Sequence, residues 1–178
     1  MADREEILAA LGSKGNRTRT PVAIPPLPQL SNEALWSLFR QRLEELGGRI
    51  ATLSELEAIL ARPFVMDVES ALRLGRIHDG TPIWDAEVGV TTADLAIAET
   101  GSIVFATGLG RPRMASLTPT RHVAIIPKDR IVAPVAEAFA RMSDRTTVII
   151  TGPSRTADIE GILVRGVHGP GDVVVIPV

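Results

Sequence analysis

Hydrophobic residues in the first part of the chain recur at helical spacing. Ser31 is a favourable helix N-cap, and Gly47 and Gly48 are typical of a helix end. Between them, an apolar stripe at intervals of three and four residues predicts an amphipathic helix. The stripe consists of Leu35, Leu38, Phe39, Leu43 and Leu46.

A second amphipathic helix is predicted between two short strands. Thr52 and Glu55 have the spacing of a capping box, and the apolar pattern that follows them continues up to Pro63. Strands are predicted on either side of this helix, at residues 49–51 and 64–68. This alternation of helices and strands is typical of a layered α/β domain.

The second half of the chain is richer in short apolar runs, which predict strands. One helix, residues 134–142, separates two of them and has a proline in its first turn. The predicted fold class is therefore α/β, with a layered sheet and flanking helices. The predicted strands are 88–90, 95–98, 102–106, 122–126, 147–150 and 173–176.

The N-terminal 30 residues have a different character from the rest. Residues 2–11 have a helical pattern that stops at Gly12, and residues 12–29 contain four prolines, which favour an extended chain. We expect residues 1–30 to form a helix and a proline-rich arm, and residues 31–178 to form a single α/β domain. The arm is either a solvated connector or a segment that packs on a partner subunit in a homodimer.

Composition narrows the classes of function. The 178 residues include no cysteine, which excludes disulfides, thiolate nucleophiles, cysteine-ligated zinc and cysteine-held iron–sulfur clusters. A net charge of −2 and 3% aromatic residues argue against a nucleic-acid partner. No apolar stretch approaches the roughly 20 residues that span a bilayer, and the acidic N-terminus does not resemble a secretory signal, so a cytoplasmic location is expected.

The most informative polar stretch follows the apolar run 147–150. It contains Gly152, Ser154, Arg155 and Thr156, and we expect it to lead into a helical turn whose backbone N–H groups bind a small anion. The hydroxyls and the guanidinium would add donors to that site. The alternative is that Ser154 only caps a structural helix.

A second unusual stretch surrounds His168, between Gly166 and Gly169. Glycine and proline here specify a tight backbone path, so His168 acts either as a base or ligand, or as a partner of its own turn. Ser154, Asp158 and His168 include the residue types of a hydrolytic triad. The nucleophile-elbow pattern Gly-x-Ser-x-Gly is absent from the chain, which argues against a hydrolase.

Two further polar positions lie beside apolar runs. Glu99 is either a turn residue facing water or a functional carboxylate between buried strands. His122 begins an apolar run, where a structural role competes with a role in a site. The third histidine, His78, lies in a polar loop. Because the three histidines are scattered we predict no metal site, and the alternative is a zinc site if the fold brings them together.

These residues together resemble the lactate-utilization protein C family, whose domain is called LUD. The resemblance begins at residues 88–91 with Asp94, continues through residues 96–101, and includes Pro119 and His122. It is strongest at residues 152–160 followed by 166–170. The match covers nearly the whole chain.

The resemblance implies a Rossmann-like core of the NagB/RpiA/CoA-transferase type and a role in oxidising L-lactate to pyruvate in bacteria. It implies two iron–sulfur partner proteins, beside which this chain would be an accessory or small-molecule-binding subunit, at most one component of a lactate-oxidising complex. Its expected ligand is a small anion or carboxylate, and no cofactor is expected to be bound through cysteine.

From the motifs, Glu99 and His168 are the candidate catalytic residues. The candidate ligand-binding residues are Thr100, Gly101, His122, Gly152, Ser154, Arg155, Thr156, Asp158, Glu160 and Gly169. The kinship to CoA transferases that the resemblance implies gives an alternative. It is a stand-alone CoA-transferase-like enzyme, or one acting on a phosphorylated ligand, with Glu99 as its nucleophile or base. A pure interaction scaffold would instead leave Asp158 and His168 on a flat surface.

Overall fold

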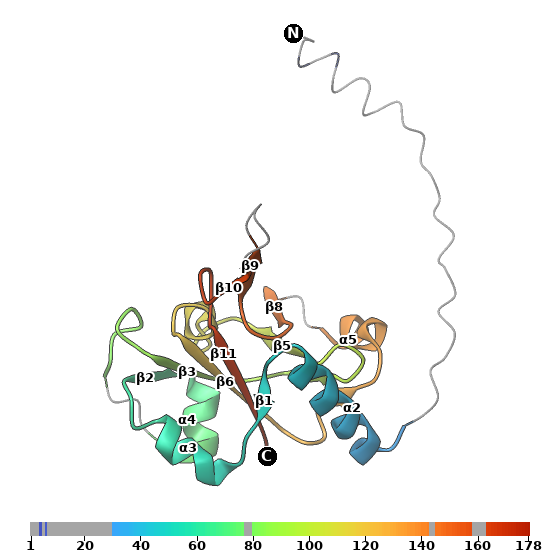
Figure 1. Ribbon diagram of the computed structural model, residues 1–178, viewed down its shortest axis with the longest axis horizontal. Helices are drawn as coiled ribbons and strands as arrows, with labels where there is room; N and C mark the ends of the chain where they lie inside the picture. The colour runs from blue at the N-terminus through green and yellow to red at the C-terminus, as the bar shows by residue number, and fades with distance from the viewer. Residues whose placement is uncertain (1–3, 5, 7–29, 77–79, 143–144, 158–162) are drawn as a thin grey trace.

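A five-stranded parallel sheet forms the centre of the fold in the computed structural model (Figure 1). The structure describes residues 4, 6, 30–76, 80–142, 145–157 and 163–178. The order of the central sheet is β1-β11-β6-β3-β2. Its strands are β1 (Arg49–Ile50), β2 (Phe64–Met66), β3 (Val88–Thr92), β6 (Arg121–Ile126) and β11 (Asp172–Pro177).

A second sheet of four strands packs against one face of the central sheet. Its order is β7-β4-β5-β8, with β5 antiparallel to both neighbours and β7 parallel to β4. An antiparallel hairpin, β9 (Arg155–Ala157) and β10 (Leu163–Arg165), projects away from both sheets (Figure 1). The strands of the second sheet are β4 (Leu95–Ile97), β5 (Ser102–Ala106), β7 (Ile131–Val132) and β8 (Thr147–Ile150).

Both faces of the central sheet are buried, which explains its continuous apolar runs. On one face, α3 (Leu53–Ile59) and α4 (Val68–Leu74) pack against alternate residues of β3, β6 and β11. On the other face, α2 (Asn32–Glu45) and the second sheet pack against the intervening residues. The predicted α/β class, with a layered sheet and flanking helices, is confirmed.

Helix ends follow the predicted capping. The Ser31 hydroxyl accepts a hydrogen bond of 3.3 Å from the N–H of Ala34, at the start of α2. At the start of α3, the Glu55 carboxylate accepts the N–H of Thr52 at 2.8 Å, as the capping box predicts. The helix predicted at 134–142 is α5 (Val135–Arg141).

The expected strand 64–68 is wrong in its second half. The strand stops at Met66, because the Asp67 carboxylate accepts the N–H of Ser70 at 2.6 Å and so begins α4. Gly75, with a φ of 62°, ends that helix in the left-handed region. The short 3-10 helix η1 (Arg113–Ser116) and β7 were also not predicted.

Several expectations fall on residues outside the described ranges. They include the proline-rich arm at 12–29, most of the helix at 2–11, and the side chains of His78, Asp158 and Glu160. The division of the chain at residue 30 stays a prediction.

Candidate functional site

A cavity of about 240 Å³ lies between β8 and the turns on either side of the β9–β10 hairpin. We call it the motif cavity, because it collects Gly152, Ser154, His168 and Gly169 from the two motif stretches. The other lining residues are Arg113, Ser116, Leu117, Val148, Ile149, Ile150, Thr151, Pro170 and Val173.

Backbone hydrogen bonds hold the two motif stretches together. The N–H of Ser154 donates to the carbonyl of Pro170 at 2.8 Å, and the N–H of Gly166 donates to the carbonyl of Ser154 at 3.0 Å. A Cβ at Gly169 would lie 3.5 Å from the Cβ of Ser154. The glycine thus lies directly against Ser154, which keeps both beside the cavity.

Over the described residues 153–157, the helical turn expected after Gly152 is wrong. Gly152 turns the chain with a φ of 78°, and residues 155–157 form β9, in which Arg155 pairs with Arg165 and Thr156 with Val164. The described residues 151–157 therefore offer no helix N-terminus to bind an anion. Thr156 lies in this hairpin rather than among the residues that line the motif cavity.

Arg155 contacts the C-terminal end of α2. One of its Nη atoms donates to the carbonyl of Leu46, the C-cap residue of that helix. A cation near a helix C-terminus also interacts favourably with the helix dipole. The structure thus gives Arg155 a role in positioning α2 against the hairpin.

Two motif glycines permit close approach to the same helix. A Cβ at Gly101, where φ is 65°, would lie 2.6 Å from the backbone nitrogen of Leu43. A Cβ at Gly152 would lie 2.8 Å from the Cβ of Leu46. Glycine is therefore required at both turns by the packing of α2.

Glu99 lies outside the motif cavity. Its side chain is exposed, and its Oε2 accepts the N–H of Val135 at 3.1 Å, which caps the first turn of α5. Glu99 is therefore not among the residues that line the motif cavity with His168. A role for Glu99 as a nucleophile stays a prediction.

Thr100 is connected to the motif cavity through hydroxyl groups. Its Oγ1 lies 2.7 Å from the Oγ of Ser102, which lies 2.9 Å from the Oγ1 of Thr151, a lining residue. This chain of three hydroxyls fixes the turn after β8 against the start of β5.

His122 is completely buried on the face of the central sheet that points toward the second sheet. It lies between Gly89 on β3 and Val173 on β11, and Val173 lines the motif cavity. Its Nε2 lies 2.8 Å from the Oγ1 of Thr91, and its Nδ1 has no hydrogen-bond partner among the described residues. Burial lowers the pKa of His122 from 6.5 to about 4. The imidazole is therefore neutral at physiological pH.

The helix η1 brings two unpredicted polar residues to the motif cavity. The carbonyl of Ala115 lies directly over β3, where a Cβ at Gly89 would be only 1.7 Å from its oxygen. This close approach positions Arg113 and Ser116 at the cavity. No periodic pattern marks η1 in the sequence, although Gly89 is part of the stretch that carries the family resemblance.

The described residues include no group of three or more histidine or acidic side chains able to hold a metal ion. Within the same ranges, no helix is both long and apolar enough to cross a membrane.

Comparison with known proteins finds curated relatives named lactate utilization protein C, and three of them illustrate the likeness. The relative from Halalkalibacterium halodurans is 39% identical over 94 residues, which are 48% of this chain and 41% of that protein. The relative from Macrococcus caseolyticus is 43% identical, with the same coverage of both chains. The relative from Bacillus subtilis is 36% identical over 52% of this chain and 48% of that protein. Each match spans less than half of the relative's length.

A solved structure has a similar fold. The crystal structure of a DUF162 family protein from Deinococcus radiodurans superposes with a TM-score of 0.59 at 22% identity. The superposition covers 84% of this chain and 99% of that one. The likeness supports the architecture described above.

A match to a protein-family model assigns the chain to a family. The model of the LUD domain matches residues 82–178, which is more than half of the chain and includes both stretches around the motif cavity. The chain belongs to the LUD domain family.

Proposed function

We propose that this protein serves in bacterial lactate utilization by binding a small 2-hydroxy or 2-oxo monocarboxylate in the motif cavity. Relatives named lactate utilization protein C support the metabolic role. The observation that carries the binding role is the convergence of Ser154, His168 and Arg113 on one cavity.

The lining groups match the parts of such a ligand. A guanidinium is a charge-assisted donor for one carboxylate, and Arg113 supplies it. Ser154 and His168 offer donors or acceptors for the oxygen on the neighbouring carbon. Val148 and Val173 provide an apolar wall for a methyl group. A lactate or pyruvate molecule is small enough for a cavity of about 240 Å³.

Electron transfer in this proposal belongs to partner proteins. Oxidation of L-lactate to pyruvate removes two electrons and two protons from the substrate, so an acceptor is required. The chain contains no cysteine, so it cannot hold an iron–sulfur cluster through thiolates. We assign the acceptor role to iron–sulfur partners and an accessory, ligand-binding role to this subunit.

Calorimetry with L-lactate and pyruvate tests the binding role. Wild-type protein should bind at least one of them, and Arg113→Gln should weaken that binding by about tenfold or more, because the carboxylate loses its cation. Glu99→Gln is the matched control outside the cavity and should bind as the wild type does. The proposal fails if wild-type protein shows no binding at about 10 mM ligand, or if Arg113→Gln binds equally well.

Growth on L-lactate tests the metabolic role separately. Deleting the gene from its bacterium should prevent growth with L-lactate as the only carbon source, and the wild-type gene should restore it. Normal growth of the deletion strain on L-lactate would contradict the role, whatever the protein binds in vitro.

A further inference from the structure

A second cavity, of about 310 Å³, lies at the opposite end of the parallel strands from the motif cavity. Asp94 enters it just after the carboxyl end of β3, and Arg130 enters it after the carboxyl end of β6. In open α/β sheets, ligands commonly bind in the crevice outside the carboxyl ends of the strands. We call this space the arginine cavity. Its lining residues are Asp94, Leu95, Val104, Ala106, Arg130, Arg141, Met142, Arg145 and Thr147.

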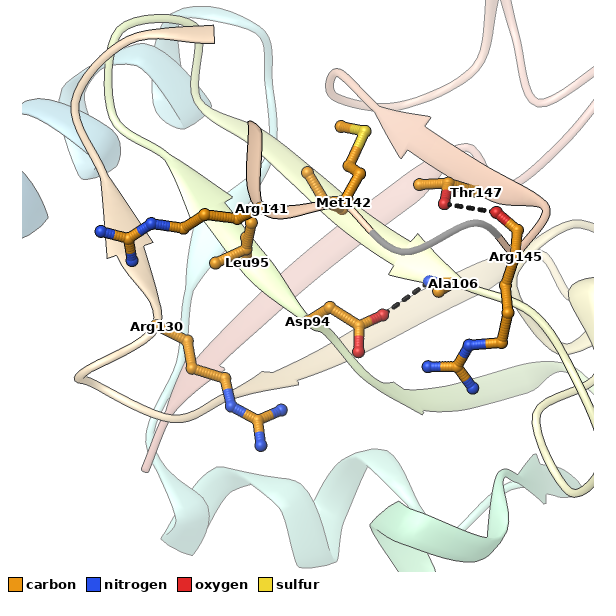
Figure 2. Close-up of a pocket in the computed structure, with 9 residues that line it drawn as sticks. Asp94, Leu95, Ala106, Arg130, Arg141, Met142, Arg145 and Thr147 are labelled. Atoms are coloured by element: carbon orange, nitrogen blue, oxygen red, sulfur yellow. Dashed lines mark hydrogen bonds between the residues drawn. The ribbon is translucent and has the colours of Figure 1, made fainter. Parts of the chain in front are cut away.

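Three arginines line the arginine cavity, each from a different segment of the chain. Arg130 follows β6, Arg141 ends α5, and Arg145 precedes β8. Figure 2 shows Arg130 and Arg145 on opposite sides of Asp94. The cavity is thus lined by guanidinium-bearing side chains that come from three separate segments of the chain.

The negative charge of Asp94 is already compensated. Its two carboxylate oxygens accept hydrogen bonds of 2.8 and 2.9 Å from Arg111, and one of them also accepts the N–H of Ala106 at 2.6 Å. Asp94 is the only carboxylate among the described residues lining the cavity. The charge of Asp94 is thus paired with Arg111, which is not among the residues that line the cavity.

Among the described residues, Arg130 forms only a long ion pair and a long hydrogen bond. Its Nη1 lies 3.6 Å from Glu69 and 3.5 Å from the carbonyl of Ala93. Glu69 is held more closely by Arg73, at 2.9 Å, and by Arg111, at 3.3 Å. Arg141, by contrast, forms a close ion pair of 2.5 Å with Glu137 on its own helix. Arg130 is thus well placed to bind a ligand.

We propose that the arginine cavity binds the phosphate monoester of a small organic molecule. Such a group carries a charge of about −1.5 to −2 at neutral pH and offers three acceptor oxygens, which suits guanidinium groups from several directions. Leu95, Val104 and Met142 form an apolar surface for the carbon skeleton. The volume lies at the lower end of the range of ligand sites, which fits a small molecule. The site shares no lining residue with the motif cavity.

Calorimetric titration with glycerol 3-phosphate tests this proposal, with malonate, L-lactate and inorganic phosphate as comparison ligands. Glycerol 3-phosphate should bind with a Kd below about 1 mM, and about tenfold more tightly than any of the three. Arg130→Gln should weaken its binding by about tenfold or more. The matched control is Arg62→Gln, which removes the same charge from an exposed arginine that pairs with Glu87 and lines neither cavity.

A second variant and a measurement of L-lactate binding complete the test of the arginine cavity. Arg145→Gln is a second variant, which decides the matter if Arg130→Gln fails to fold, and it should also weaken binding of glycerol 3-phosphate. L-lactate binding should be unchanged by Arg130→Gln, so failure here is distinct from failure of the motif-cavity proposal. Equal binding by wild type and both variants, tight binding of malonate, or no binding of glycerol 3-phosphate would overturn the proposal.

Discussion

The Nε2 of His122 lies 2.8 Å from the Oγ1 of Thr91, and both side chains are completely buried in the central sheet. The other ring nitrogen of His122 has no partner among the described residues. A buried N–H without an acceptor is costly, so the favoured neutral tautomer carries its proton on Nε2 and donates it to Thr91. The pair thus ties β6 to β3 beside the motif cavity, while the imidazole stays uncharged.

His122 makes the protein less stable in mild acid. Its pKa is about 4 in the folded state, against 6.5 for an unburied histidine. Between these values the histidine of the unfolded chain binds a proton that the folded chain does not. The contribution of neutral His122 to the free energy of unfolding is therefore complete above pH 6.5 and is lost as the pH falls toward 4. The expected loss is about 3 kcal/mol over that window.

Urea denaturation at several pH values between 7 and 4 measures this effect. His122→Gln should flatten the dependence of the free energy of unfolding on pH. His168→Gln, which changes an exposed histidine, should keep the pH dependence of the wild type. Burial raises the pKa of Asp67 above 3.8, so its contribution to stability is present at low pH and is lost as the pH rises. Asp67 therefore acts in the opposite direction and is unchanged in both variants. Equal slopes for wild type and His122→Gln would contradict the assignment.

The ion pair between Asp94 and Arg111 should matter far more than the exposed ion pairs. Arg111 is nearly buried, donates to both oxygens of Asp94, and lies 5.0 Å from the ring centre of Phe105. Asp94→Ala leaves this guanidinium without its main partner, and we expect a loss of about 2–4 kcal/mol in the free energy of unfolding.

Chemical denaturation compares this variant with a surface control. Glu87→Ala removes the partner of Arg62 from an exposed pair and should cost less than about 1 kcal/mol. If Asp94→Ala lowers the free energy of unfolding no more than Glu87→Ala does, the ion pair between Asp94 and Arg111 does not stabilise the fold more than an exposed pair.

Some features of the fold follow from local sequence and others do not. The caps at Ser31 and Thr52 and the apolar runs of β6 and β11 are local signals, so these elements were predicted. The helix α4 follows a strand after a single residue, Asp67, and the apolar Val68 directly after it made the strand look longer than it is.

Only the part of the candidate site that local sequence motifs mark was predicted. Gly152, Ser154, His168 and Gly169 are local motifs, and the structure brings them to one cavity. Arg113 was missed because η1 reaches the cavity only through its packing over Gly89. The arginine cavity was missed entirely, since its charged residues come from distant segments that no single window of sequence contains.

Gly89→Ala should disturb the motif cavity without touching a lining residue. The added Cβ would lie 1.7 Å from the carbonyl oxygen of Ala115, so η1 must move and carry Arg113 and Ser116 with it. We expect a lower melting temperature and weaker binding of L-lactate, measured by thermal unfolding and calorimetry.

Gly108→Ala is the matched control for that variant. The nearest atom to its added Cβ would be 3.6 Å away, on the flexible side chain of Arg145, and its φ is not in the left-handed region. It should leave the melting temperature and L-lactate binding close to those of the wild type. Wild-type binding by Gly89→Ala would contradict the role given to η1.

The central claim is that the motif cavity binds a lactate-like monocarboxylate, and NMR tests it most directly. Isotope-labelled wild-type protein is titrated with L-lactate while its backbone amide signals are recorded. The expected result is saturable shifts concentrated at Ser116, Gly152, Ser154, His168 and Gly169, which line that cavity. No saturable shift at about 20 mM L-lactate, or shifts concentrated instead around Asp94 and Arg130, would contradict the account.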